Sequence, residues 1–113
     1  MGACPASPNC VSSRADASDA EHFYPALSYE GDLGPAQDKM KAVVLALPRT
    51  ALVAERPGYL WFSFTSATMG FVDDVEMEFG DGKIQVRSAS RVGYGDMGVN
   101  RKRMDAIAAG WGR

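Results

Sequence analysis

Three glycines close together are the first feature of this sequence that could serve a chemical purpose. Gly93, Gly95 and Gly98 lie in the stretch GYGDMG and spell G-x-G-x-x-G, the spacing of a loop that wraps a dinucleotide pyrophosphate. Such a loop opens a helix that leads to a second parallel strand, with an acidic residue about 20 positions further on. From here to Arg113 the sequence holds neither, and the P-loop pattern G-x-x-x-x-G-K-[ST] is also missing. We interpret the spacing as a coincidence of glycines and expect no cofactor.

Basic and small polar side chains flank the same stretch, and they could hold an anion. Arginines in the first turn of a helix oppose the helix dipole, so Arg101 and Arg103 need compensating negative charge. One interpretation is an ion network with nearby carboxylates. The other is a pocket for a small anionic ligand, a phosphate or a carboxylate. The candidate ligand-binding residues are Arg87, Ser88, Ser90, Arg91, Asn100, Arg101 and Arg103.

The two cysteines could form a disulfide, bind a metal or supply a nucleophile. Cys4 and Cys10 can close a small loop by a disulfide in an oxidising compartment, whereas both stay thiols in the cytosol. A zinc site would have to borrow the single histidine, His22, and a carboxylate, so no metal is expected. Catalysis by Cys10 would also need His22 to fold back onto it. We favour Cys10 as a small buried side chain, and the disulfide stays open.

Asp73 and Asp74 could supply an acid and a base to a small hydrolase or transferase. Neighbouring residues on a strand point to opposite faces, so the two carboxylates do not share one site in a simple way. Asp74 and Glu76 share a face and could bind a divalent cation, but Arg87 is expected opposite Glu76 and already supplies positive charge. An enzyme that uses Asp73, Asp74 or Cys10 is the alternative hypothesis, and enzymatic activity stays an open question.

Periodicity and turn signals predict the elements that hold these residues. Residues 1–26 contain prolines, serines and a short acidic run, which indicates an irregular N-terminal arm. Residues 27–113 are expected to form one domain, with strands at 27–30, 51–55, 59–66, 72–79 and 83–91. One helix is expected at 35–47, with Pro35 at its first position, and another from Asn100 as its N-cap. The fold class is α+β: a single antiparallel sheet of about five strands with two helices packed on one face, in the order β-α-β-β-β-β-α.

One pair of strands can be predicted in register. Asp81-Gly82 is a strong signal for a two-residue hairpin turn, in which both positions take positive φ. Phe79 then lies opposite Ile84, and Glu76 lies opposite Arg87. Apolar residues meet apolar ones and acid meets base, and a slip by one residue would destroy both matches.

Three segments of the sequence resemble those of the DUF1499 family, a domain of unknown function. They are CPASPNCVSS from Cys4, GFVDDVE from Gly70 and RSASRVGYGDMGVNRKR from Arg87, and in this order they span nearly the whole chain. The resemblance implies no activity. It does imply that their polar residues belong together. Beside the ligand-binding candidates, these form a candidate structural network of Asp73, Asp74, Glu76, Asp96, Asn9, Ser12 and Ser13.

Composition argues against several classes of function. The 12 basic and 14 acidic side chains give a net charge of −2, which disfavours bulk attraction to nucleic acid or to an anionic membrane. No apolar run approaches the roughly 18 residues of a membrane helix. The chain as written is expected in the cytoplasm, or in the periplasm or a lumen if an export segment has been trimmed from it. The function that the residues favour is non-enzymatic binding of a small anionic ligand or a protein partner through the Arg/Asp/Ser/Asn cluster.

Overall fold

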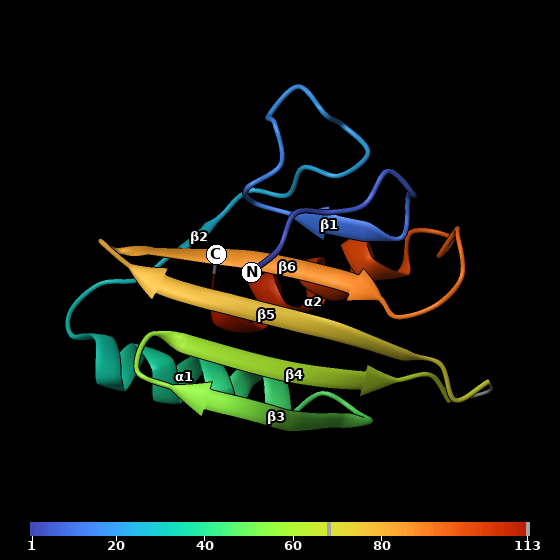
Figure 1. The fold of residues 1–113 in the computed structure, drawn as a ribbon. Helices are drawn as coiled ribbons and strands as arrows, with labels where there is room; N and C mark the ends of the chain where they lie inside the picture. The colour runs from blue at the N-terminus through green and yellow to red at the C-terminus, as the bar shows by residue number, and fades with distance from the viewer. Residues whose placement is uncertain (68, 113) are drawn as a thin grey trace.

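An antiparallel sheet with two helices on one of its faces forms the body of the protein (Figure 1). The structure is a computed structural model and describes residues 1–67 and 69–112. The strands are β1 (Cys10–Ser12), β2 (Leu27–Ser28), β3 (Thr50–Arg56), β4 (Tyr59–Thr65), β5 (Val72–Gly80) and β6 (Lys83–Ser90), and the helices are α1 (Leu33–Leu45) and α2 (Val99–Trp111). The predicted α+β class is confirmed, with six strands in place of about five.

Two short strands near the N-terminus complete the sheet beside β6. The strand order is β1-β6-β5-β4-β3, and β2 pairs with β6 at the end nearer the hairpin turn. β1 departs from the expectation that residues 1–26 are irregular. Its three residues are too few to show an alternating pattern, and all three are buried. Pairing with β6, rather than any local signal, makes this segment a strand.

The hairpin of β5 and β6 has the predicted register. Glu76 lies opposite Arg87 and Phe79 opposite Ile84. Asp81 and Gly82 form the turn, with positive φ angles of 52° and 74°. Side chains of β5 therefore alternate between a buried and a half-buried face along the strand.

Both helices bury one face against the same side of the sheet. Apolar residues of α1 and α2 meet alternate residues of the central strands in one core, which includes Met40, Val44, Leu60, Phe62, Val75, Met77, Ile84, Val86, Met104 and Ile107. Burial of this apolar surface is the main force that holds the layers together. Within the described residues no helix covers the opposite side of the sheet, which we call the open face (Figure 1). No helix within the same residues is long and apolar enough to span a membrane.

The helices begin at different residues from those expected. α1 begins at Leu33, so Pro35 is its third residue, where a missing N–H costs no intrahelical hydrogen bond. α2 begins at Val99, and its N-cap is Gly98 in the left-handed conformation. Asn100 is therefore not the N-cap, because Asp96 accepts hydrogen bonds from the N–H groups of Gly98 and Asn100. This leaves the Asn100 side chain free to turn inward.

Candidate functional site

The pleat of the sheet divides the candidate residues between its two faces. Ser88, Ser90 and Asp73 lie on the side of α2, whereas the neighbouring acidic and basic residues of β5 and β6 lie on the open face. The structure does not bring the four candidate arginines into one pocket. Arg87 and Arg91 lie on the open face, and Arg101 and Arg103 extend from α2 in different directions.

Asn100 is the centre of a buried set of polar groups between α2 and β6. Its side chain is fully buried. The amide nitrogen lies 2.7 Å from the Asp96 carboxylate, 3.0 Å from the Ser90 hydroxyl and 3.2 Å from the Asn9 carbonyl. The amide oxygen accepts from the Ser88 hydroxyl at 2.7 Å and from the Arg103 guanidinium at 2.9 Å. We call this set the polar cluster: Asn9, Asp73, Ser88, Ser90, Asp96, Asn100 and Arg103.

Arg103 connects the polar cluster to Asp73 of β5. Its guanidinium lies 2.8 Å from the Asp73 carboxylate, and the two side chains are only 13% and 12% exposed. The same guanidinium lies over the ring of Phe64, 4.7 Å from the ring centroid. Breaking the ion pair would leave a charge unpaired where water barely reaches it. This cost keeps Arg103 and Asp73 in contact.

Asp96 fixes the glycine-rich loop to the start of α2. Its carboxylate accepts from the backbone N–H groups of Gly98 at 2.9 Å and Asn100 at 3.1 Å. Burial opposes ionisation of Asp96, but the hydrogen bonds from Asn100 and Gly98 outweigh it and lower the pKa of the carboxyl below its ordinary value. A phosphate-binding loop needs such N–H groups for its ligand. Here a carboxylate of the loop itself occupies them.

The network residues of the N-terminal segment hold β1 in place. The Asn9 side chain donates to the Gly93 carbonyl at 2.7 Å, which joins β1 to the glycine-rich loop. The Ser13 hydroxyl accepts from the N–H of Val86 at 2.8 Å. Ser12 is buried, and its hydroxyl accepts from a backbone N–H two residues further on. Asn9 thus reaches the polar cluster, whereas Ser12 and Ser13 tie β1 to β6.

Asp74 and Arg91 form a bidentate ion pair on the open face. The Nε and Nη2 atoms of Arg91 each lie 2.8 Å from an Asp74 carboxylate oxygen. The indole N–H of Trp61 donates to the same carboxylate at 2.8 Å. The hydrogen bonds from Arg91 and then from Trp61 hold the pKa of Asp74 below its ordinary value. Asp74 is thus ionised, and both of its carboxylate oxygens accept hydrogen bonds from the protein, as expected of a structural carboxylate.

A second set on the open face joins Glu76 to Arg87 and Tyr59. The nearest guanidinium nitrogen of Arg87 lies 3.9 Å from the Glu76 carboxylate, and Arg87 also donates to the Ala3 carbonyl at 3.4 Å. Glu76 accepts a hydrogen bond from the hydroxyl of Tyr59. Burial, together with Glu76, raises the pKa of Tyr59 to about 12, so this hydroxyl stays a donor.

Arg101 points away from the other arginines. It donates to the carbonyl oxygens of Ala20 at 3.2 Å and Glu21 at 3.3 Å. Its guanidinium lies 5.8 Å from the centroid of the Tyr24 ring. Arg101 therefore fastens α2 to the chain segment that precedes β2.

A disulfide joins Cys4 to Cys10, and the sulfur of Cys10 is buried. In this form Cys10 has no thiolate to offer as a nucleophile. The loop that it closes lies at the sheet edge, since Cys10 is the first residue of β1 and pairs with Ala89. No group of three or more potential metal-ligating side chains occurs within residues 1–67 and 69–112.

His22 joins the disulfide loop to the segment before β2. Its Nδ1 lies 2.7 Å from the Asp19 carboxylate, and its Nε2 lies 2.9 Å from the Ser7 carbonyl and 3.3 Å from the Glu21 carboxylate. All of these partners are acceptors, so the surroundings favour the doubly protonated ring, in which both nitrogens donate. The Ser7 carbonyl first and then Asp19 raise the pKa of His22 above its ordinary value of 6.5.

A cavity of about 200 Å³ lies beside the polar cluster, bordered by Ser66 and Phe71 before β5 and by residues from Val92 to Val99 after β6. Its polar lining comes from the cluster, through Asp73, Ser90, Asp96 and Arg103, and its apolar lining from Phe71, Val92 and Val99. It is the place where the polar cluster meets solvent.

Exposed apolar side chains are frequent in the two chain segments that border this cavity. In the described part of the chain, six of the eight large exposed apolar residues lie before β5 or between β6 and the first residue of α2: Met69, Phe71, Val92, Tyr94, Met97 and Val99. Three of them, Phe71, Val92 and Val99, line the cavity itself. We call all six the apolar rim. Met97 is 93% exposed and has a φ of 56°, a left-handed conformation that residues other than glycine seldom adopt. None of the six is among the residues predicted from sequence. The available signal was a series of large apolar residues separated by glycines, which no regular element could bury.

Comparison with known proteins gives a family and no activity. A family model described as "Protein of unknown function (DUF1499)" matches residues 1–110. No curated protein and no solved structure matches the chain. The matched range includes all three segments on which the resemblance rests.

Proposed function

The chain belongs to the DUF1499 family, a membership that assigns no activity, and we propose that it is a non-enzymatic binding protein that docks a protein partner on the apolar rim. The polar cluster is the rigid support of this surface. The observation that carries the proposal is the gathering of exposed apolar side chains in the two segments that border one cavity, three of which line it. Soluble proteins seldom expose such residues together unless something covers them.

The chemistry of the apolar rim suits a protein interface. Tyrosine and methionine are enriched where proteins meet, because each offers a large apolar area that a partner can cover. Tyr94 and Met97 are 73% and 93% exposed, so nearly their whole side chains are available for burial. Covering apolar surface contributes about 25 cal/mol for each Å² removed from water.

The cavity gives the surface a place for one side chain of the partner. The carboxylates of Asp73 and Asp96 line it together with the guanidinium of Arg103. These formal charges leave the lining with an excess of negative charge. A neutral or cationic side chain is therefore favoured over an anionic one.

A small anionic ligand is the second candidate, because Arg103 reaches the cavity lining. An anion would have to take the place of Asp73, which already lies 2.8 Å from Arg103. The measurement that separates the candidates is thermal unfolding in phosphate against chloride at equal ionic strength. A small-ligand site predicts a saturable rise of the melting temperature in phosphate only.

The hydrolase or transferase alternative receives less support. Asp73 and Asp74 are each held in an ion pair, with Arg103 and Arg91 respectively. Cys10 is bonded to Cys4. Each of the three candidate catalytic groups is thus engaged in a structural contact.

The partner proposal can be tested by photo-crosslinking in cells that produce the protein. A photoreactive amino acid at Tyr94 is expected to give a discrete crosslinked species, because this side chain lies in the proposed interface. The matched control is Val53 of β3, which is 43% exposed but lies outside the apolar rim. Phe71→Ser with Val92→Ser should abolish the Tyr94 adduct. Equal crosslinking from both positions, or an adduct that survives the double substitution, would contradict the proposal.

A further inference from the structure

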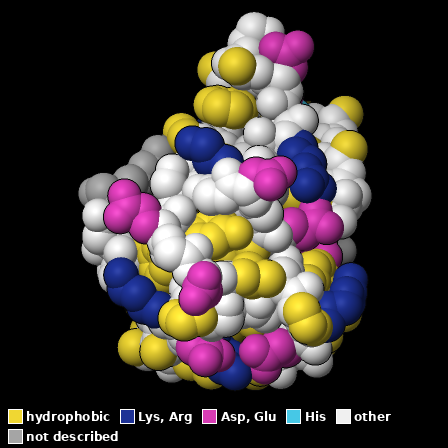
Figure 2. Space-filling model, turned by 90° about the vertical axis from the view of Figure 1, so that its left-hand side faces the viewer, with side chains coloured by type: hydrophobic (Ala, Val, Ile, Leu, Met, Phe, Trp, Pro, Cys, Tyr) yellow, Lys and Arg dark blue, Asp and Glu magenta, His cyan; other side chains and the backbone are white. Residues whose placement is uncertain are grey.

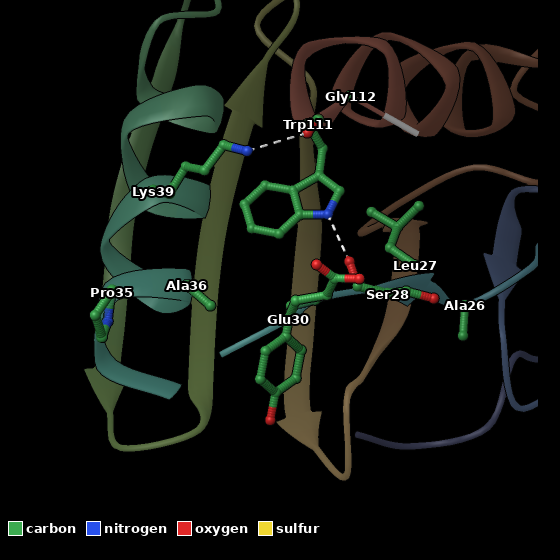
Figure 3. A pocket seen from close by; sticks show the side chains of 10 residues that line it. Ala26, Leu27, Ser28, Glu30, Pro35, Ala36, Lys39, Trp111 and Gly112 are labelled. Atoms are coloured by element: carbon green, nitrogen blue, oxygen red, sulfur yellow. Dashed lines mark hydrogen bonds between the residues drawn. The ribbon is translucent and has the colours of Figure 1, made fainter. Parts of the chain in front are cut away.

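A groove of about 670 Å³ lies at the opposite end of α2 from the apolar rim. It is formed by the first turns of α1, by β2 with the residues that follow it, and by the last turn of α2 (Figure 3). Figure 2 shows the end of the molecule where β2 and the start of α1 lie, with apolar surface gathered between acidic and basic side chains. Because α2 has 13 residues, its ends are about 18 Å apart. The groove is therefore a separate site.

Trp111 forms one wall of the groove and is held in a fixed orientation. Its indole N–H donates to the Ser28 carbonyl at 2.8 Å. The Lys39 ammonium lies 4.4 Å from the centroid of the ring and 3.4 Å from the Trp111 carbonyl. Figure 3 shows the indole between β2 and α1, with Lys39 reaching toward it from the helix. The Lys39 ammonium covers one face of the indole, and another flat apolar group can stack on that face when the lysine side chain swings off it.

Small side chains keep the space in front of Trp111 open. Pro35 and Ala36 line the groove from α1, and the picture places them across from the indole (Figure 3). Leu27 is buried and closes the groove toward the core. The volume falls within the roughly 300 to 1,000 Å³ of cavities that hold small organic ligands.

Two opposite charges line the groove without neutralising each other. Lys39 comes from α1 and Glu30 from the segment after β2 (Figure 3). Within the part of the chain that the structure describes, neither forms a salt bridge, and Glu30 forms no hydrogen bond. A ligand with a negative and a positive group could therefore pair with both residues while its apolar part covers the indole.

We propose that this groove binds a small zwitterion of the amino-acid type that carries an aromatic side chain. The ligand carboxylate pairs with Lys39 and draws its ammonium off the indole, the aromatic ring takes its place on Trp111, and the ligand ammonium pairs with Glu30. The three contacts together select the class of ligand. Lys39 alone would accept a simple acid, and Glu30 alone would accept a simple amine. This site is independent of the proposed partner surface.

Nuclear magnetic resonance of the two tryptophan indole groups tests the proposal with phenylalanine as the probe. Trp111 lies in the groove, whereas Trp61 donates to Asp74 on the open face and serves as an internal control. Millimolar phenylalanine is expected to shift the Trp111 indole signal in a saturable way and to leave the Trp61 signal unchanged. Phenylacetate lacks the ammonium and phenethylamine lacks the carboxylate, so each should bind at least about tenfold more weakly.

Two exposed residues provide the matched variants. Lys39→Met should reduce phenylalanine affinity to that of phenethylamine for the native protein, and Glu30→Gln should reduce it to that of phenylacetate. Lys41→Met is the control on the same helix, because Lys41 pairs with Glu55 outside the groove. Tyr94→Ser should leave phenylalanine binding unchanged, which separates this site from the apolar rim.

Several outcomes would overturn the proposal. One is an unmoved Trp111 signal, and another is a shift of both indole signals in proportion to concentration. Equal affinity for phenylalanine and phenethylamine would also overturn it, because the carboxylate would then contribute nothing. Equal loss of binding in the Lys39→Met and Lys41→Met variants would remove the assigned role of Lys39.

Discussion

At the scale of single residues, Asn100 links several parts of the fold. Its side chain contacts Asn9 just before β1, Ser88 of β6, Arg103 of α2 and Asp96 of the glycine-rich loop. Asparagine suits this place because one planar amide both donates and accepts. Aspartate would place a further negative charge beside Asp96, and leucine would leave the surrounding polar groups unpaired.

Asn100→Ala is expected to lower the free energy of unfolding by about 2 to 4 kcal/mol, because buried hydroxyl, carboxylate and guanidinium groups lose their partner. Chemical denaturation measures this change. Lys102→Ala is the control, because Lys102 lies exposed in the same turn of α2 and should change stability by less than about 0.5 kcal/mol. Equal effects from the two substitutions would contradict the central role of Asn100.

Arg101 distinguishes a ligand site from a structural contact. Arg101→Ala should lower the free energy of unfolding by about 1 kcal/mol, since its bonds to the carbonyls of Ala20 and Glu21 are lost. The loss should be the same in phosphate and in chloride at equal ionic strength. A phosphate-dependent stabilisation that disappears in the variant would instead support the anion pocket expected from the sequence.

His22 predicts a dependence of stability on pH. Its pKa is raised in the folded state, so protonated His22 stabilises the fold fully below its ordinary pKa of 6.5. This contribution is lost as the pH rises through the folded-state pKa. The free energy of unfolding, followed across this window, should therefore fall with rising pH.

The His22→Asn variant isolates this effect, because His22 is the only histidine in the chain. The variant should lack the decrease that the native protein shows between the two pKa values. The same slope in both proteins would show that His22 is not linked to folding.

At the scale of elements, the β5–β6 hairpin is the part that the sequence determines most completely. The turn residues Asp81 and Gly82 tolerate positive φ, and the alternating pattern of both strands agrees with only one register. β1 could not be predicted in the same way. Residues Cys10–Ser12 become a strand only because β6 presents a free edge to them.

The Glu76–Arg87 pair tests the energy of this register. In a double-mutant cycle of Glu76→Gln and Arg87→Gln, a coupling energy of about 0.5 kcal/mol is expected, because the two charged groups are 3.9 Å apart and partly exposed. The cycle is measured by urea denaturation at low salt. A coupling of zero there would show that facing positions in the hairpin do not interact energetically.

The candidate site could be predicted only in part, because some of it depends on how α2 packs. The resemblance to the family implied that Asp73, Asp96 and Asn100 belong together, although it did not say whether they form a ligand site or a structural network. Alternation along β6 separates Arg87 from Ser88, and this follows from the predicted register. No local sequence pattern indicates where the side chains of Arg101 and Arg103 point, because this depends on how α2 packs.

At the scale of the whole molecule, stability and the proposed binding surface belong to different residues. The core lies between the sheet and the helices, whereas the apolar rim lies in the segments before β5 and between β6 and the first residue of α2. Tyr94→Ser with Met97→Ser should therefore change the free energy of unfolding by less than about 0.5 kcal/mol. Thermal and chemical unfolding measure this change. A large destabilisation would show that the apolar rim packs against the protein itself and would remove its availability to a partner.

The disulfide loop has a further consequence through the edges of the sheet. β1 and β2 together cover the outer edge of β6, and on the opposite edge β3 carries an irregularity between Leu52 and Ala54. If reduction of Cys4–Cys10 releases β1, the N–H and C=O groups around Arg87 and Ala89 lose their partners. An uncovered strand of this kind is a template on which further chains can add, as in domain swapping and fibril growth. We therefore expect reduction of the Cys4–Cys10 bond, where it releases β1, to favour polymerisation through β6.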